Sequence, residues 1–484
     1  MQAPIISYLC PCKTSYICKL ENKELKLSFF NILRKKIKSK YDSIDNTNFK
    51  TNLLNALPFW VGAIITGLVS VLYATLFSWA EDASAYIFHQ SQWLFLIITP
   101  VTFVFAAWLV LKYSPFARGS GIPQVTAAIE LTNPKEKHKV RDLLSLRVVF
   151  IKIASSLTMI FGGAAIGREG PTIQISASIF KKINDFLPDW YPKVSKRNMI
   201  VTGAAAGLAS AFNTPLGGIV FAIEELTKTH FSYFKSALLT GVIIAGLTAL
   251  NILGPYLYLG YPETINISKW LVLIVIPVAI LAGIAGSGMG RLILWLLDKK
   301  KYLKKRGVLL TFAAVCGLAL ALIAIYVDER AFGSGKEIMQ TTLFTPNKEV
   351  EWSVPFLRII GPVLSFSSGA AGGIFAPSLS LGASIGAFSS TFFNLSGSEV
   401  NLLILCGMVA ALTGITRSPF TSSILVIEMT NDHGMIFYIM MTALAANLVA
   451  TLVSKRSFYD HLKDKFLQEV HLNEEKEQRN VISQ

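Results

Sequence analysis

Long apolar runs separated by short charged segments dominate the pattern of hydrophobic and polar positions along this chain. A membrane-spanning helix needs about 20 apolar residues. Most of the uncharged runs are long enough to cross a bilayer, and the run of 40 residues has room for two helices. The pattern predicts an all-α polytopic membrane protein. The uncharged runs cover residues 53–80, 93–111, 236–262, 270–290, 307–327, 359–398 and 434–454.

Composition and charge place the chain in the same class. Apolar residues make up 52% of its 484 residues and charged residues only 15%, a balance far from that of a soluble domain. The formal net charge of +15 lies in loops and tails, where Lys and Arg set the orientation in the bilayer. The basic excess therefore indicates topology. We expect membrane lipid around the protein and no nucleic-acid partner.

The distribution of Lys and Arg gives one consistent orientation. Residues 1–50 are polar and basic, and we predict a cytoplasmic N-terminal extension there. Basic residues within 131–147 and 299–306 mark further cytoplasmic loops. Both termini are expected on the cytoplasmic side. Acidic residues gather instead in a loop that suits the outside, at Asp328, Glu329, Glu349 and Glu351.

Neither the histidines nor the cysteines form a pattern typical of a metal or cofactor site. The six histidines are scattered without ligand spacing, and Gly119-Ser-Gly121 lacks the rest of a phosphate-binding loop. Cys316 and Cys406 lie in apolar spans and are interpreted as packing residues. We therefore predict no cofactor and no metal. Three cysteines near the start leave a metal site, a leader segment and an over-long gene start open as interpretations: Cys10, Cys12 and Cys18.

An internal repeat is the clearest architectural signal. Residues 203–224 read GAAAGLASAFNTPLGGIVFAIE and residues 407–428 read GMVAALTGITRSPFTSSILVIE, with glycine, proline and glutamate at the same spacing. In the first copy, Asn213-Thr-Pro215 should break a helix. Broken helices at membrane depth occur where they are buried or line a cavity. Duplicated halves with paired broken helices point to a transport site near the midplane of the bilayer.

The stretch Gly162–Gln174 places Glu169 inside an apolar run of small residues. An ionisable side chain at membrane depth is costly and usually functional. Pro171 suits the first turn of a helix, whose N-terminal amides attract anions. We hypothesise that the Glu169 carboxylate competes with a small anion for one cluster of amides.

Three glycine–proline loops of this kind, at 119–123, 167–171 and 373–377, are expected to converge on one site. Helix starts carry partial positive charges, which attract a permeant anion without trapping it. The alternative for each loop is ordinary packing of small residues between helices. From the predicted topology, Ser120 should approach the site from the cytoplasmic half and Glu169 from the outer half.

Other charges inside the spans are interpreted as structural. Lys152 is expected to form a buried ion pair, with Glu130 as its candidate partner. Arg168 and Arg358 are placed in the same structural class.

The motifs Gly119-Ser-Gly-Ile-Pro123, Gly167-Arg-Glu-Gly-Pro171, Gly373-Ile-Phe-Ala-Pro377 and Ser457-Phe-Tyr459 together resemble those of the CLC chloride channels and chloride/proton antiporters. The resemblance covers roughly residues 53–462. It implies a homodimer with one ion pathway per subunit, and two repeats of inverted topology built from tilted and broken helices. It also implies selectivity-filter motifs formed by Gly119, Ser120, Gly121, Ile122, Pro123, Gly167, Arg168, Glu169, Gly170, Pro171, Gly373, Ile374, Phe375, Ala376 and Pro377.

The resemblance assigns anion-binding roles to four positions. Ser120 and Tyr459 match side chains whose hydroxyls coordinate chloride, and Ile374 and Phe375 match positions whose backbone amides do so. Ser120 stands where a proline would suggest nitrate, so it favours chloride. The intact Gly-Arg-Glu-Gly-Pro motif is unlike the fluoride branch of the family.

Two glutamates match the family's proton pathway. Glu169 corresponds to the external gating glutamate, and Glu225 to the internal proton-transfer glutamate that marks antiporters. The resemblance therefore predicts exchange of chloride for protons. The alternatives are a passive, proton-gated chloride channel of the same fold, a carrier of a larger anion, and an intramembrane enzyme using Ser120 or Glu169. No matched acid–base set supports the enzyme.

Some positions depart from the family pattern. Gln124 and Thr126 replace acids found in some bacterial members, and Thr126 removes one partner for Lys152. No paired regulatory domains are expected after the last span, which favours a bacterial inner membrane. The predicted division is an extension at 1–50, a transmembrane domain at 51–462 with repeats at about 51–262 and 268–462, and a short cytoplasmic tail at 463–484.

Overall fold

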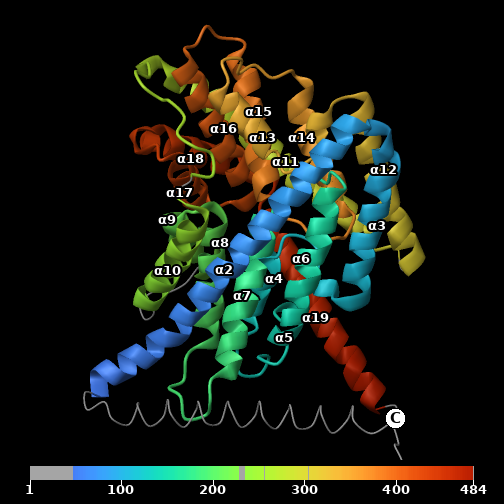
Figure 1. Ribbon diagram of the computed structural model, residues 1–484, viewed down its shortest axis with the longest axis vertical. Helices are drawn as coiled ribbons and strands as arrows, with labels where there is room; N and C mark the ends of the chain where they lie inside the picture. The colour runs from blue at the N-terminus through green and yellow to red at the C-terminus, as the bar shows by residue number, and fades with distance from the viewer. Residues whose placement is uncertain (1–46, 228–234, 255–256, 304, 483–484) are drawn as a thin grey trace, which may run out of the picture. The chain divides into compact units, whose positions relative to one another are not determined.

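The computed structural model describes residues 47–227, 235–254, 257–303 and 305–482 (Figure 1). The chain divides into two compact units, Met1–Leu57 and Pro58–Gln484. The predicted N-terminal extension and its Cys10, Cys12 and Cys18 lie almost wholly outside the described residues. The α-helices are α2 Thr47–Gln90, α3 Phe95–Tyr113, α4 Ile122–Glu130, α5 Val140–Leu143, α6 Leu146–Phe161, α7 Glu169–Phe186, α8 Lys196–Phe212, α9 Pro215–Phe221, α10 Lys235–Leu253, α11 Val272–Lys300, α12 Arg306–Tyr326, α13 Lys336–Phe344, α14 Ser353–Ser367, α15 Phe375–Ser390, α16 Gly397–Thr416, α17 Pro419–Thr430, α18 Ile436–Val453 and α19 Phe458–Ile482.

The prediction of an all-α polytopic membrane protein is confirmed. Eight helical segments of the described residues are long and apolar enough to cross a membrane. Within the same residues, β-structure is limited to two isolated bridges. The uncharged run at 359–398 does contain two helices, since α14 ends at Ser367 and α15 begins at Phe375. This is the arrangement that the length of the run predicted.

The outer end of the first span differs from the sequence-based expectation. The charged pair Glu81-Asp82 suggested that the helix ends there, but α2 continues to Gln90. No glycine or proline interrupts the chain between Glu81 and Gln90, so the helix has no local reason to stop. The Glu81 carboxylate also accepts a hydrogen bond of 2.6 Å from the Ser334 amide, which satisfies its charge inside the fold.

Both copies of the internal repeat break a helix in the same way. In the first, α8 ends at Phe212, Asn213 adopts a left-handed conformation with φ of 57°, and Pro215 begins α9. In the second, α16 ends at Thr416, Arg417 has φ of 64°, and Pro419 begins α17. A left-handed residue ends a helix and a proline suits the first turn of the next. The predicted break at 213–215 is confirmed.

Helix α16 forms the centre of the second half, because all of its residues from Glu399 to Thr416 are buried. It packs closely against α15 at Gly382 and Gly407. A Cβ atom on Gly382 would lie 2.1 Å from the Gly407 carbonyl oxygen, so only glycine allows this approach. Small residues at such contacts let the backbones of membrane helices pack together.

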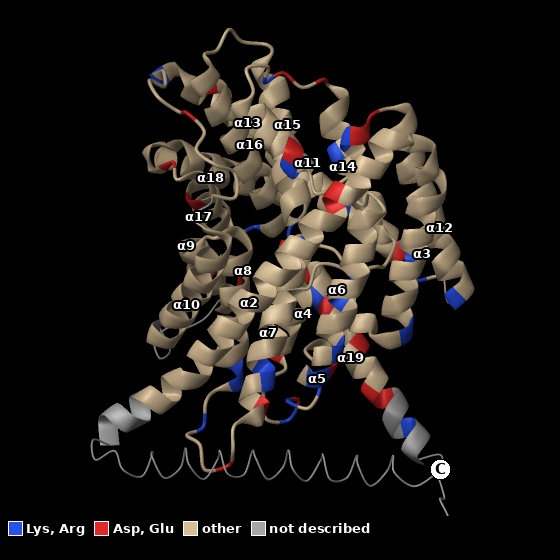
Figure 2. Ribbon diagram, viewed as in Figure 1, with Lys and Arg blue, Asp and Glu red and all other residues tan. Residues whose placement is uncertain are grey.

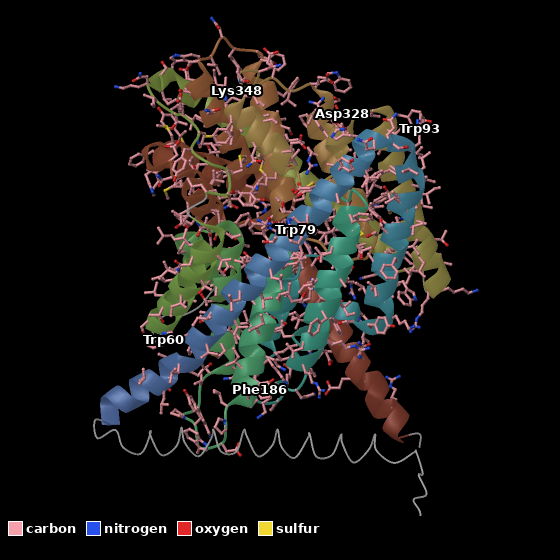
Figure 3. All side chains as sticks on the ribbon, viewed as in Figure 1. Trp60, Trp79, Trp93, Phe186, Asp328 and Lys348 are labelled. Carbon is pink, nitrogen blue, oxygen red and sulfur yellow. The ribbon has the colours of Figure 1, made fainter. Side chains whose placement is uncertain are left out.

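Exposed side chains on the spanning helices are mostly large and apolar, as lipid contact requires. Trp79 on α2 is 65% exposed and Trp93 is 54% exposed (Figure 3). Charged residues instead gather toward the ends of the helices (Figure 2). We call the end where α3 and α7 finish and α5 begins the basic end.

Candidate functional site

The three glycine–proline loops lie side by side, as the sequence predicted. The Gly119 amide donates to the Ala370 carbonyl at 2.8 Å, and the Gly372 amide donates to the Gly119 carbonyl at 3.2 Å. Gly167 and Gly373 exchange two backbone hydrogen bonds, both of 2.8 Å. The third loop therefore lies between the first two and joins them.

Each of these loops leads into the start of a helix. Helices α4, α7 and α15 begin at Ile122, Glu169 and Phe375, and no side chain caps any of the three. The first amides of a helix lack partners within it and carry the positive end of the helix dipole. Three uncapped helix starts at joined loops give a site that favours a small anion.

Glu169 lies at this site with only 1% of its surface exposed. The Tyr258 hydroxyl donates to its Oε1 at 3.4 Å, and the Ala376 backbone amide faces the carboxylate. A Cβ atom on Gly167 would lie 2.3 Å from Oε2, so the glycine makes room for the carboxylate. The carboxylate thus lies at the start of α15, beside amides that the sequence hypothesis assigned to an anion.

Ser120 and Tyr459 bring two buried hydroxyls to the same region. Their relative exposures are 1% and 2%, and the two hydroxyls face each other. Among the described residues, neither hydroxyl has a hydrogen-bond partner of good geometry. Buried polar atoms without partners are rare, and each calls for a ligand or another explanation. A small anion between the two hydroxyls satisfies both.

Aromatic rings connect the site from one side to the other. Tyr258 packs against Phe212 with ring centroids 5.0 Å apart, and Phe212 lies 6.4 Å from Phe375. Phe375 stacks on Tyr459 at 6.2 Å with an interplanar angle of 21°. These rings separate the Glu169 carboxylate from the Tyr459 hydroxyl with an apolar wall.

Glu225 reaches the same region from another direction. It is 5% exposed and lies in a π-helical turn, Ala222–Thr227, that follows α9. The Ser418 hydroxyl donates to its Oε2 at 2.7 Å. A narrow cavity lined by Glu225, Phe375 and Tyr459, among others, joins this carboxylate to the anion site.

The neighbouring Glu224 does different work. Its carboxylate accepts from the amides of Phe420 at 3.2 Å and Thr421 at 2.7 Å, so it caps α17. In the other half, Glu428 accepts from the amides of Leu216 at 3.0 Å and Gly217 at 2.6 Å and caps α9. Glu224 and Glu428 occupy the same position in the repeat, so each half caps a broken helix of the other.

The predicted ion pair between Lys152 and Glu130 is wrong. Lys152 is fully buried, and its Nζ donates to the Gly119 carbonyl at 3.0 Å. Glu130 is half exposed and accepts from Lys463 of α19 at 2.5 Å. Because Lys152 lies deep in α6 and Glu130 ends α4, the nearest acceptor is a loop carbonyl. Lys152 therefore fixes the first loop of the site.

The structural interpretation of the two arginines agrees with their contacts. Arg358 is fully buried and donates to the carbonyls of Phe332 and Gly333 and to the Ser380 hydroxyl. Arg168 donates to the Ala74 carbonyl at 2.8 Å. In the described part of the chain, no group of three or more His, Cys, Asp or Glu residues is placed to hold a metal ion.

Tyr258 was not predicted from the sequence, although it contacts Glu169 directly. It lies in a segment without regular structure between α10 and α11, and it belongs to no recurring motif. Its position depends on how that segment folds back over Phe212, which local sequence does not specify.

Comparison with known proteins gives consistent relatives. The family model described as "Voltage gated chloride channel" matches residues 102–451. The H(+)/Cl(-) exchange transporter ClcA of Citrobacter koseri is 29% identical over 446 residues, covering 85% of this chain and 88% of that protein. The protein of the same name from Salmonella arizonae is 30% identical over 442 residues, with the same coverage.

Solved structures share the fold. A slow cyanobacterial Cl-/H+ antiporter superimposes with a TM-score of 0.74 and 24% identity, covering 86% of this chain and 98% of that one. A CLC-type fluoride/proton antiporter gives a TM-score of 0.71 and 21% identity with the same coverage. Because the family model covers more than half of its residues, this chain belongs to the CLC family of voltage-gated chloride channel proteins.

Proposed function

We propose that this protein is a secondary-active antiporter that exchanges chloride for protons across a membrane. The observation that carries the proposal is the position of Glu169, a buried carboxylate beside the uncapped start of α15. The names of the bacterial relatives, as H(+)/Cl(-) exchange transporters, point to the same activity. Transport, rather than an enzymatic reaction, is the function of this site.

Chloride binds between the two partnerless hydroxyls and the start of α15. Ser120 and Tyr459 donate from their side chains, and Ile374 and Phe375 donate from their backbone amides. Both hydroxyls are buried and face each other, which suits a desolvated monovalent anion. Partial charges hold the anion weakly enough to let it leave, as transport requires.

Glu169 acts as the external gate and proton carrier. In its ionised form the carboxylate occupies amides at the start of α15 and competes with chloride. Protonation removes that negative charge, so the side chain leaves and chloride enters. One event thereby couples the two ions, because the proton neutralises the competitor of the anion.

Glu225 supplies protons from the opposite side of the anion site. It reaches Tyr459 through the narrow cavity that both residues line. This route is separate from the loops that hold the anion, so the two ions follow different paths over part of the protein. A passive channel has no need of a second buried carboxylate at this position.

The experiment is proton movement driven by a chloride gradient in liposomes. Glu169→Gln is expected to keep chloride flux and lose coupled proton flux, because glutamine neither binds the amides as an anion nor carries a proton. Coupling that survives this change contradicts the mechanism. A wild-type reversal potential set by chloride alone supports the passive channel instead.

Assembly and location follow from the same proposal. We infer a homodimer with one pathway per subunit, in a bacterial inner membrane, with both termini cytoplasmic. The excess of Lys and Arg at the basic end supports this orientation. The repeat halves at about 51–262 and 268–462 form the transmembrane domain of each subunit. Chloride is a substrate, and no cofactor takes part.

A further inference from the structure

A second cavity, of about 980 Å³, opens at the basic end of the helices, away from the anion site. The end of α3, the start of α6, the end of α7 and the distal part of α19 surround it. None of the residues proposed for chloride or proton transport lines this cavity. It is therefore a separate feature of the protein.

The wall of this cavity carries an excess of positive charge. Four cations against two carboxylates leave a formal charge of +2. Lys181 is matched by Asp185 at 2.8 Å, whereas Arg141, Arg147 and Lys182 form no ion pair within the described part of the chain. The charged residues of the wall are Arg141, Arg147, Lys181, Lys182, Asp142 and Asp185.

One edge of the cavity is apolar and faces lipid. Leu146 lines the cavity and is 42% exposed, and Phe150, one turn further along α6, is 70% exposed. Residues four apart lie on one helix face, and α6 belongs to a candidate membrane span. Phe186 at the end of α7 is 66% exposed (Figure 3), and Lys182 lies 4.3 Å from its ring centroid.

We propose that this cavity binds the phosphate headgroup of an anionic phospholipid in the leaflet at the basic end. Basic pockets between membrane helices on the cytoplasmic side recognise such headgroups. Figure 2 shows Lys and Arg gathered near the ends of α5, α7 and α19, where the cavity lies. The apolar edge distinguishes a lipid from a soluble phosphate, since only the lipid has acyl chains to lay against Leu146 and Phe186.

The cavity also adjoins a segment that positions the anion site. Phe116 forms part of its wall, and the Phe116 carbonyl accepts hydrogen bonds of 3.2 Å from both Gln124 of α4 and Gln174 of α7. Both helices begin at loops of the anion site. A bound headgroup therefore stabilises the segment that holds these two helices together, and the lipid is expected to raise the thermal stability of the protein.

The test compares two pairs of substitutions in the full-length protein, purified in neutral detergent and titrated with phosphatidylglycerol. Arg147→Gln with Lys182→Gln removes one cation from each of two cavity helices. Lys193→Gln with Arg197→Gln removes two exposed cations from the segment between α7 and α8 that do not line the cavity. Bound lipid is counted by native mass spectrometry, and the thermal unfolding midpoint is recorded alongside.

The cavity pair is expected to weaken phosphatidylglycerol binding by about 25-fold, since each cation near an anionic headgroup contributes about fivefold. The control pair should bind as the wild type does. Equal losses in both pairs, or no loss in the cavity pair, overturn the proposal. Inorganic phosphate that gives the same stabilisation in phosphatidylcholine micelles overturns the lipid assignment in favour of a soluble anion.

A charge-conserving pair, Arg147→Lys with Lys182→Arg, guards against a folding defect. It should retain lipid binding if charge is what recognises the headgroup. Loss of binding in a folded charge-conserving pair, as judged by an unchanged unfolding midpoint without lipid, also contradicts the proposal.

Discussion

The two repeat-related broken helices have the same backbone and different chemistry. Each half has a left-handed residue, a proline-initiated helix and a glutamate that caps the other half, Glu224 on α17 and Glu428 on α9. After that shared glutamate the halves diverge, because Glu225 follows Glu224 whereas Met429 follows Glu428. Shared acids are structural here, and the unshared acid is the candidate for transport.

The π-helical turn accounts for how one half places both acids at the same helix start. In a regular α-helix, adjacent residues point about 100° apart. The turn at Ala222–Thr227 lets Glu224 bond the amides of Phe420 and Thr421 while Glu225 accepts from Ser418. Such turns occur often at functional sites. The second half has a regular helix, α17, at the equivalent place.

The largest expected effect separates these two acids. Glu225→Ala should reduce chloride-driven proton uptake by about 100-fold or more, the scale of a lost proton-transfer group. Glu224→Gln should leave the ratio of proton to chloride flux unchanged, because its carboxylate only caps α17. Both variants are measured in the liposome assay. Loss of coupling in Glu224→Gln together with normal coupling in Glu225→Ala would reverse the assignment.

The next effect tests the reciprocal caps. Glu224→Ala and Glu428→Ala should each destabilise the protein by about 1–2 kcal/mol, because each removes the carboxylate that satisfies two amides at a helix start. Thermal unfolding in detergent gives the comparison. Glu349→Ala, an exposed acid, serves as the control. A loss in only one of the two cap variants would show that the halves are not equivalent in this respect.

Much of this architecture was predictable because it rests on local signals. Asn213-Thr-Pro215 breaks a helix by its own conformational limits, and the loops at 119–123, 167–171 and 373–377 begin helices for the same kind of reason. The partner of Lys152 was not predictable. Its acceptor, the Gly119 carbonyl, comes from a loop 33 residues away, and only packing brings the two together.

Tyr258 extends that lesson to the gate, and it provides a smaller test. Its hydroxyl donates to Glu169 Oε1 at 3.4 Å, so Tyr258→Phe removes one stabilising contact of the ionised carboxylate. A bond to a charged group contributes about 1 kcal/mol or somewhat more. Chloride should therefore compete better and bind roughly fivefold more tightly, as measured by calorimetry. Tyr261→Phe, which is exposed, should leave chloride affinity unchanged.

The smallest effect concerns ties between elements at the basic end, which contrast with the caps inside the membrane. Glu136, in the segment between α4 and α5, contacts His471 of α19 at 2.8 Å and Lys139 at 3.2 Å. Glu474 of α19 contacts Lys139 at 2.6 Å and His138 at 3.1 Å. These contacts hold the distal part of α19 to the segment that follows α4, and both helices begin at the anion site.

This tie should weaken in acid. The hydrogen bond from His471 lowers the pKa of Glu136 below its ordinary 4.5, and the one from Lys139 lowers the pKa of Glu474 in the same direction. A carboxyl whose folded-state pKa is lowered adds stability above its ordinary value and loses it as the pH falls through the folded value. Unfolding midpoints should therefore fall below about pH 4.5, and less so in Glu136→Gln with Glu474→Gln. Glu475→Gln should behave as the wild type, and an equal slope in all three proteins would place the acid sensitivity elsewhere.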